Sequence, residues 1–296
     1  MSISAIDLGT NTLRILILDS NNKTMFKKNF YLFLGGYIVD GHLSREGIEK
    51  IKAVLLELKT IYEKFGICKI YAVATAFARK IKNASVLEEL FKDILSSELN
   101  IINGYLEGLI VVKAISERFK IDNFLVIDIG GGSTEFSLKK GAHVSIESLD
   151  VGSLSLKNTF FKHYPPNNEE KNSLFKYIIE HFANIKINLD NIEYVYGVGG
   201  TITTIAFLLS GLKSYDAERI NGFIIDRKEL ESFCHKIEFL SMKQLIEIFP
   251  IEKGREEVLL SGSLFLLSIL NYFNLKTILA SDVSLLEGII PFYSEN

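Results

Sequence analysis

The chain has 296 residues, of which 48% are hydrophobic and 23% charged, and this composition is typical of a folded globular protein long enough for two domains. A formal net charge of −3 excludes the global basic field that nucleic-acid-binding proteins use. No stretch reaches the about 20 consecutive apolar residues of a membrane-spanning helix, and the N-terminus has no signal-peptide pattern. We therefore expect a cytoplasmic protein without DNA, RNA or membrane partners.

Two cysteines, Cys68 and Cys234, lie far apart in the sequence and lack the spacing of a disulfide framework or a zinc site. The five histidines are also scattered without ligand spacing. We expect both cysteines to be buried, because free cysteine usually packs as a small apolar residue.

Strands and helices alternate in the first part of the chain. Apolar alternation predicts strands over residues 2–6, 13–18, 23–33, 67–74 and 100–102, and helical stripes predict helices over residues 44–65, 83–99 and 105–119. Ser44 is the expected N-cap of the first helix and Gly66 its end. Ser85 and Glu88 have the spacing of a capping box for the second helix. Such alternation predicts a sheet with parallel members.

The pattern of the N-terminus restarts at Phe124. Asp7-Leu8-Gly9-Thr10 and Asp128-Ile129-Gly130-Gly131 each follow a hydrophobic strand and precede a second one, at an offset of 121 residues. We therefore predict two similar domains, residues 1–120 and 121–296, with the last helix able to pack back on the first. Further strands are expected over 124–127, 135–138, 143–149, 194–198 and 277–280, and helices over 169–184, 227–237, 241–248, 256–272 and after Gly199-Gly200-Thr201.

The paired turns at Asp7 and Asp128 carry the strongest chemical signal. A carboxylate at the end of a strand can hold a hydrated Mg²⁺ ion, and the glycines that follow can present backbone N–H groups to phosphate oxygens. Each turn alone could equally be an ordinary β-turn that uses Asp and Gly for local reasons. Two such turns at domain spacing favour a phosphate site.

Residues Asp128–Glu135 form the most specific single stretch. The three consecutive glycines, Gly130-Gly131-Gly132, lower the stability of regular structure and suit a chain that approaches a ligand closely. Ser133 and Thr134 add hydroxyl donors. No Gly-Lys-Ser/Thr follows, and the residues after the turn favour a strand, so the stretch is neither a P-loop nor a dinucleotide-binding turn.

Six motifs together resemble the exopolyphosphatase/guanosine pentaphosphate phosphatase (Ppx/GppA) family in its short, two-domain form. In chain order they are Asp7–Thr12, Ala74-Thr75-Ala76 with Arg79, Asn103-Gly104 with Glu107, Asp128–Glu135, Gly199-Gly200-Thr201 and Ser281-Asp282. The resemblance implies an α/β, duplicated actin-like and sugar-kinase-like (ribonuclease H-like) fold with central mixed sheets and a phosphate cleft between domains. It also implies release of the terminal phosphate of polyphosphate or guanosine pentaphosphate, a stringent-response alarmone.

Site residues follow from the resemblance. Glu107 matches the glutamate taken as the catalytic base, Glu135 its partner, and Asp128 a metal-associated carboxylate, while Arg79 meets phosphate as a guanidinium fork. The expected Mg²⁺ ligands are Asp7, Asp128 and Glu135. The expected phosphate-binding residues are Asp7, Gly9, Thr10, Asn11, Thr12, Thr75, Gly130, Gly131, Gly132, Ser133, Thr134, Gly199, Gly200 and Thr201.

One departure from the family pattern is Tyr105-Leu106, where acidic residues usually precede the catalytic glutamate. Alternative functions are an ATP-dependent kinase or activator ATPase of the same fold, a non-catalytic polyphosphate or alarmone sensor, and an actin-like structural protein. The turns bind the anhydride shared by both substrates and do not separate polyphosphate from guanosine pentaphosphate. A homodimer is expected from the resemblance alone.

Overall fold

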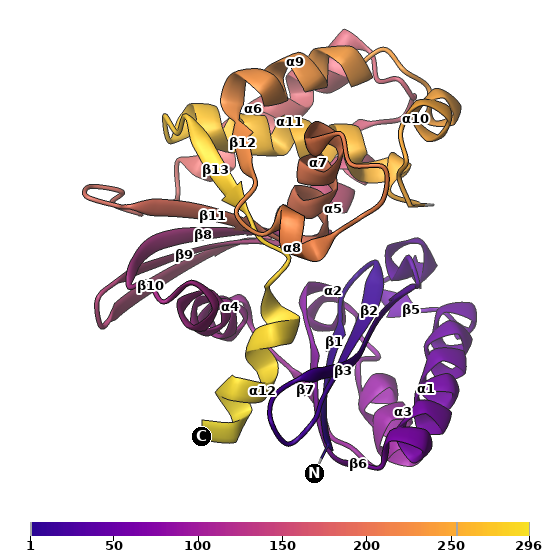
Figure 1. Ribbon diagram of the computed structural model, residues 1–296. Helices are drawn as coiled ribbons and strands as arrows, with labels where there is room; N and C mark the ends of the chain where they lie inside the picture. Colours follow the sequence, from indigo (N-terminus) through magenta and orange to yellow (C-terminus); the bar gives the residue numbers. More distant parts are fainter. Residues whose placement is uncertain (1, 253, 296) are drawn as a thin grey trace. The chain divides into compact units, whose positions relative to one another are not determined.

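The computed structural model describes residues 2–252 and 254–295 and divides into two compact units (Figure 1). The first unit contains the residues up to Arg118 together with those from Leu285 onward, and the second contains Phe119–Ser284. The C-terminal helix α12 (Leu285–Glu295) therefore belongs to the first unit, where it packs against β1 and β2. Among the described residues, no helix has the length and apolar character needed to cross a bilayer.

The first unit is built on a mixed sheet in the order β3-β2-β1-β6-β7. Its strands are β1 (Ser2–Leu8), β2 (Thr12–Leu18), β3 (Thr24–Tyr31), β6 (Ile67–Ala74) and β7 (Leu99–Ile101). The first three form an antiparallel meander, and β6 and β7 add in parallel. The remaining elements are η1 (Leu34–Tyr37), β4 (Ile38–Val39), β5 (His42–Leu43), α1 (Arg45–Phe65), α2 (Ala76–Lys80), α3 (Ser85–Leu95) and α4 (Gly104–Phe119).

Helix α1 is confirmed with its predicted ends. The Ser44 hydroxyl accepts a hydrogen bond from the N–H of Gly47, and Gly66 ends the helix in the left-handed conformation at φ 61°. The predicted capping box at Ser85 is wrong, because Ser85 lies inside α3 and Ala84 occupies the N-cap position. The helix also ends at Leu95, since Ser96 turns the backbone into the left-handed region, and Leu99 begins a strand.

The second unit has a mixed sheet in the order β10-β9-β8-β11-β13-β12. Its strands are β8 (Asn123–Ile129), β9 (Thr134–Lys140), β10 (His143–Leu149), β11 (Tyr194–Val198), β12 (Ile224–Asp226) and β13 (Thr277–Ala280). Its helices are α5 (Ser153–Phe160), α6 (Asn168–Phe182), α7 (Gly199–Ser210), α8 (Ala217–Ile220), α9 (Arg227–Ile237), α10 (Met242–Ile248) and α11 (Glu256–Tyr272). The short elements α5, α8 and β12, like η1 and α2 in the first unit, were absent from the sequence prediction.

The backbone confirms the predicted repeat. Strand β8 begins and ends 121 residues after β1. Both units open with an antiparallel meander of three strands followed by a parallel strand on the other side of the first. The two turns share one hydrogen bond, from Gly9 N to Thr12 O and from Gly130 N to Ser133 O, each 3.0 Å long.

Each unit has its own hydrophobic core, as expected from the chain length. In the first unit, Ile51, Leu55 and Leu58 of α1 bury one face of the helix. Cys234 lies in the core of the second unit, as predicted, but Cys68 is exposed. The prediction for Cys68 is wrong because Cys68 lies at the exposed start of β6, where its thiol donates to the carbonyl of Gly66.

Packing of α12 on α4 depends on Gly288. A Cβ atom at this position would overlap the carbonyl oxygen of Ile110, which belongs to the backbone and cannot rotate away. We predict that Gly288→Ala lowers the free energy of unfolding by about 1–3 kcal/mol, although alanine favours a helix more than glycine does. Gly36→Ala is the control, since a Cβ there meets nothing within 4 Å. Equal urea-unfolding midpoints for the two variants would contradict this packing.

Candidate active site

The turn after β1 places a carboxylate and a guanidinium side by side. Asp7 stands opposite Arg14 in the register of β1 and β2, and Arg14 Nε donates to Asp7 Oδ2 at 2.7 Å, with Nη2 in contact with the same oxygen. Asp7 is only 2% exposed. Its other oxygen, Oδ1, is buried without a hydrogen-bond partner among the described residues, as is Oδ1 of Asn11. Two buried acceptors at one turn are suited to donors such as bound water.

The carbonyl groups of this turn are used by the chain that follows β3. Leu32 and Phe33 donate their N–H groups to the carbonyl of Asn11, and Leu34 donates to that of Thr10, over 2.8–3.0 Å. Because the carbonyl oxygens are engaged on this side, the turn can present its N–H groups elsewhere to an anion.

Arg79 and Glu107 are brought together in the first unit. Thr75 follows β6, and Arg79 lies one turn further, in α2. Arg79 Nη1 donates to the carbonyl of Ile102 at 2.7 Å and to Glu107 Oε2 at 3.2 Å. Asn103 caps α4 by accepting the N–H of Leu106, which fixes the first turn of the helix that carries Glu107. Glu107 is 8% exposed, so it is not the solvated helix residue that its sequence position alone suggests.

In the second unit, two buried carboxylates lie opposite one another on neighbouring strands. Asp128 and Glu135 are directly opposite in the register of β8 and β9, and they are 7% and 1% exposed. Directly opposite residues of antiparallel strands project from the same face, where like charges destabilise the pair. Ser148 Oγ donates to Glu135 Oε1 at 2.9 Å. Glu135 occupies the position that Arg14 holds in the first unit, at the offset of 121 residues.

The first residues of α5 donate hydrogen bonds to the carbonyl groups of the triple-glycine turn. The N–H of Ser153 donates to the carbonyl of Gly130, and those of Leu154 and Ser155 donate to the carbonyl of Gly131, all at 3.0 Å. A Cβ at Gly152 would lie 2.6 Å from Gly130 O, so only glycine allows this approach. Thr134 is fully buried and its hydroxyl donates to Val151 O at 2.7 Å, which joins β9 to the segment before α5. The expected phosphate contact of Thr134 stays a prediction.

The first turn of α7 lies next to the carboxylate of Asp128. Gly199 has φ 87°, and a Cβ there would lie 2.6 Å from Asp128 Oδ1. The guanidinium of Arg255 lies directly against Gly200, in the space that a side chain would fill. Thr201 donates from its hydroxyl to Ser153 Oγ at 3.2 Å, which joins α7 to α5. The N-terminus of a helix and a guanidinium both favour anions.

Two of these groups were missed by the sequence analysis. Arg14 follows Asp7 within a hairpin, and the two-residue alternation of β2 would have placed it on the face of Asp7. Arg255 carries no local signal, because its contact with Gly200 joins segments 55 residues apart.

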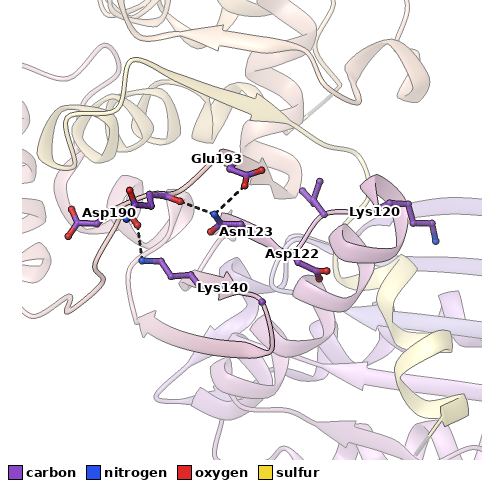
Figure 2. Close-up of a pocket in the computed structure, with 9 residues that line it drawn as sticks. Lys120, Asp122, Asn123, Lys140, Asp190 and Glu193 are labelled. Carbon is purple, nitrogen blue, oxygen red and sulfur yellow. Dashed lines mark hydrogen bonds between the residues drawn. The ribbon is translucent and has the colours of Figure 1, made fainter.

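A separate hollow lies at the ends of β8 and β9 that are farther from the glycine turn (Figure 2). Its volume is about 550 Å³, and it is lined by residues that include Asn123 at the start of β8 and Lys140 at the end of β9. Asn123 Nδ2 donates to Asn191 O at 2.8 Å, and Lys140 Nζ donates to Asp190 O at 2.9 Å. No predicted site residue lines it, so it stands apart from the glycine turns.

The donor set of the second unit fits Mg²⁺. Within the described part of the chain, no group of three or more His, Cys, Asp or Glu side chains is placed to hold a metal. Mg²⁺ does not require such a cage, because it keeps several water ligands and commonly binds one or two carboxylates plus substrate phosphate. Asp128 and Glu135 meet that requirement, and a cation between them would relieve their repulsion. Asp7 already has Arg14 as its counter-ion, which makes it the weaker ligand of the three.

Comparison with known proteins defines the class. The model of the Ppx/GppA phosphatase family matches residues 19–294. A bifunctional 3-dehydroquinate synthase/phosphatase of Fusobacterium nucleatum is 30% identical over 99% of this chain, which spans only 46% of that relative. Exopolyphosphatase 2 of Mycobacterium tuberculosis is 26% identical over 88% of each chain.

Among solved structures, a Ppx/GppA family member of Aquifex aeolicus is 28% identical, with a TM-score of 0.85 over 100% of this chain and 99% of its own. The fold is thus the two-domain, actin-like α/β fold with mixed sheets that the sequence predicted. The chain belongs to the Ppx/GppA phosphatase family.

The ion pair of Asp7 and Arg14 can be tested by unfolding. We predict that Arg14→Met lowers the free energy of unfolding by about 3 kcal/mol, because it leaves a buried carboxylate without its counter-ion. Adding Asp7→Asn should restore at least about 1 kcal/mol, because the second change removes that charge. Urea unfolding of the two single variants and the double variant measures the coupling. Additive losses would show that the two side chains do not depend on one another.

Proposed function

We propose that this protein hydrolyses the terminal phosphoanhydride bond of a polyanionic substrate, inorganic polyphosphate or guanosine pentaphosphate. The observation that carries the proposal is the burial of Glu107 against Arg79, together with a pair of buried carboxylates next to a triple-glycine turn. Membership of a phosphatase family and the similarity to exopolyphosphatase 2 support it.

Glu107 is the general base in this proposal. Water is a weak nucleophile, and a carboxylate that accepts its proton as it attacks phosphorus accelerates hydrolysis by roughly 10²–10⁴-fold. Arg79 fixes the orientation of Glu107 through the Nη1–Oε2 contact, while its second bond from Nη1, to Ile102, holds the guanidinium in place. The same guanidinium supplies positive charge beside the base, where phosphate charge develops.

Glycine turns hold the phosphate groups. The N–H groups of Gly9 and Gly130 close the two turns by donating to Thr12 O and Ser133 O, and the N–H groups that follow them would donate to phosphate oxygens. Asp128 and Glu135 would hold Mg²⁺, which supplies positive charge that offsets the charge of the phosphate chain. Asp7, through its unpaired Oδ1, would accept a hydrogen bond from a water molecule at the first turn.

The alternative of a pure sensor is less favoured. A protein that only binds polyanions gains nothing from burying the carboxylates of Glu107 and Glu135 near the phosphate groups, because like charges repel. A kinase would need an acceptor site, and the sequence has no recognisable sugar-binding signature. The homodimer and the cytoplasmic location remain predictions from the sequence.

Replacement of the base tests the proposal. We expect Glu107→Gln to lower kcat for phosphate release by at least about 100-fold with little change in KM, because the amide cannot accept the proton. Long-chain polyphosphate and guanosine pentaphosphate should be assayed side by side, with Mg²⁺ and with excess chelator, and phosphate release should require the metal.

The matched control is Glu88→Gln, which removes an exposed carboxylate from α3 and should leave the rate unchanged. Absence of phosphate release from both substrates by the unmodified protein with Mg²⁺ would refute the proposal. Equal rates for Glu107→Gln and the control would refute the assignment of the base.

A further inference from the structure

Tyr215 presents a fixed aromatic ring at the surface of the second unit. It lies in the segment between α7 and α8, and the two helices pack side by side (Figure 1). The residue is 44% exposed, so part of its side chain is open to solvent. Its hydroxyl donates to Asp282 Oδ1 at 2.5 Å, and its ring packs edge-on against Phe207 with centroids 5.8 Å apart. The hydrogen bond to Asp282 and the contact with Phe207 together fix the position of the Tyr215 ring.

Asp282, which accepts the hydrogen bond from Tyr215, lies in a segment that is hydrogen-bonded to β11, the strand that precedes α7. The N–H of Asp282 donates to Asn221 Oδ1 at 2.8 Å, and the N–H of Ser281 donates to the carbonyl of Gly197 at 2.9 Å. Gly197 belongs to β11, two residues before Gly199. The ring position is thus fixed relative to the glycine turn that adjoins Asp128.

Groups at the first turn of α7 act on the hydroxyl of Tyr215. Burial of the hydroxyl and the Asp282 carboxylate raise the pKa of Tyr215, whereas the Thr203 hydroxyl and the positive charge of Arg255 lower it. Thr203 donates in turn to the carbonyl of Gly199 at 3.2 Å. The phenol head of Tyr215 therefore faces the same first turn of α7 that Arg255 covers at Gly200.

We propose that Tyr215 is a stacking platform for the base of a nucleotide polyphosphate, so that it selects nucleotide over inorganic substrates. The inference rests on the proposed function for the phosphate part of the ligand and adds the residue that recognises the remainder. Every nucleobase has a flat π-face that stacks on an exposed aromatic ring, and a ring that is already fixed loses little freedom on binding. Inorganic polyphosphate has no such face.

Binding measurements separate the two ligand classes. The ligands are an imido analogue of guanosine triphosphate, which resists hydrolysis, and the matching inorganic imidotriphosphate, each titrated calorimetrically with Mg²⁺. We expect Tyr215→Ala to weaken binding of the guanosine ligand by about 5- to 100-fold and to change binding of the inorganic ligand by less than about twofold. Tyr215→Phe keeps the ring and should stay within about threefold of the unmodified protein for both ligands.

Tyr194→Ala is the matched control, because Tyr194 is 41% exposed and begins β11, at the opposite end of the strand from Gly199. It should change neither affinity. The inference would be overturned if Tyr215→Ala lowered the affinity for both ligands equally, or lowered neither affinity. It would also be overturned if Tyr194→Ala had the same effect as Tyr215→Ala, or if the unmodified protein failed to bind the guanosine ligand. These titrations need no turnover, so a protein that hydrolyses neither substrate would refute the proposed function and could still show the selective loss.

Discussion

The charge opposite each strand-end aspartate decides what the two halves of this protein can do. The same hairpin occurs twice, at an offset of 121 residues, and pairs Asp7 with Arg14 in one unit but Asp128 with Glu135 in the other. The first aspartate is neutralised within the fold. The second faces a like charge in a buried position, and like charges directly opposite one another destabilise a strand pair. The duplicated backbone thus carries an ion pair in one unit and two facing carboxylates in the other.

The two hairpins share a second constraint, which concerns their backbone. In each unit the segment that follows the third strand donates N–H groups to the carbonyls of the glycine turn: residues 32–34 in the first and 153–155 in the second. These segments also stand at the offset of 121 residues, although the first leads into the short 3₁₀ helix η1 and the second opens α5. Engaged carbonyls leave the N–H side of each turn to a ligand, so the shape of the phosphate site depends on residues outside the motifs. Gly152 is one of them, because any side chain there would push the turn away.

The sequence predicted the parts of this arrangement that depend on local pattern. The repeat, the strands that flank each turn and the capped helix α1 follow from periodicity and from residues such as Ser44 and Gly66. The family followed from motifs spread along the chain. Contacts between distant segments could not be predicted, and these include Arg255 against Gly200 and α5 against the triple-glycine turn. The burial of Glu107 is a further case, because its helix position alone suggests a solvated residue, whereas tertiary packing places it beside Arg79.

The assignment of the cation to the second unit can be tested by measuring metal affinity without any substrate. Mn²⁺ is a paramagnetic substitute for Mg²⁺ with the same preference for oxygen ligands, and its binding can be followed by electron paramagnetic resonance. Glu135→Gln should weaken Mn²⁺ binding by at least about tenfold, because it removes one of two carboxylates from the site, whereas Asp7→Asn should leave the affinity within about threefold. Loss of Mn²⁺ binding in Asp7→Asn with retention in Glu135→Gln would contradict the assignment of the cation to the second unit.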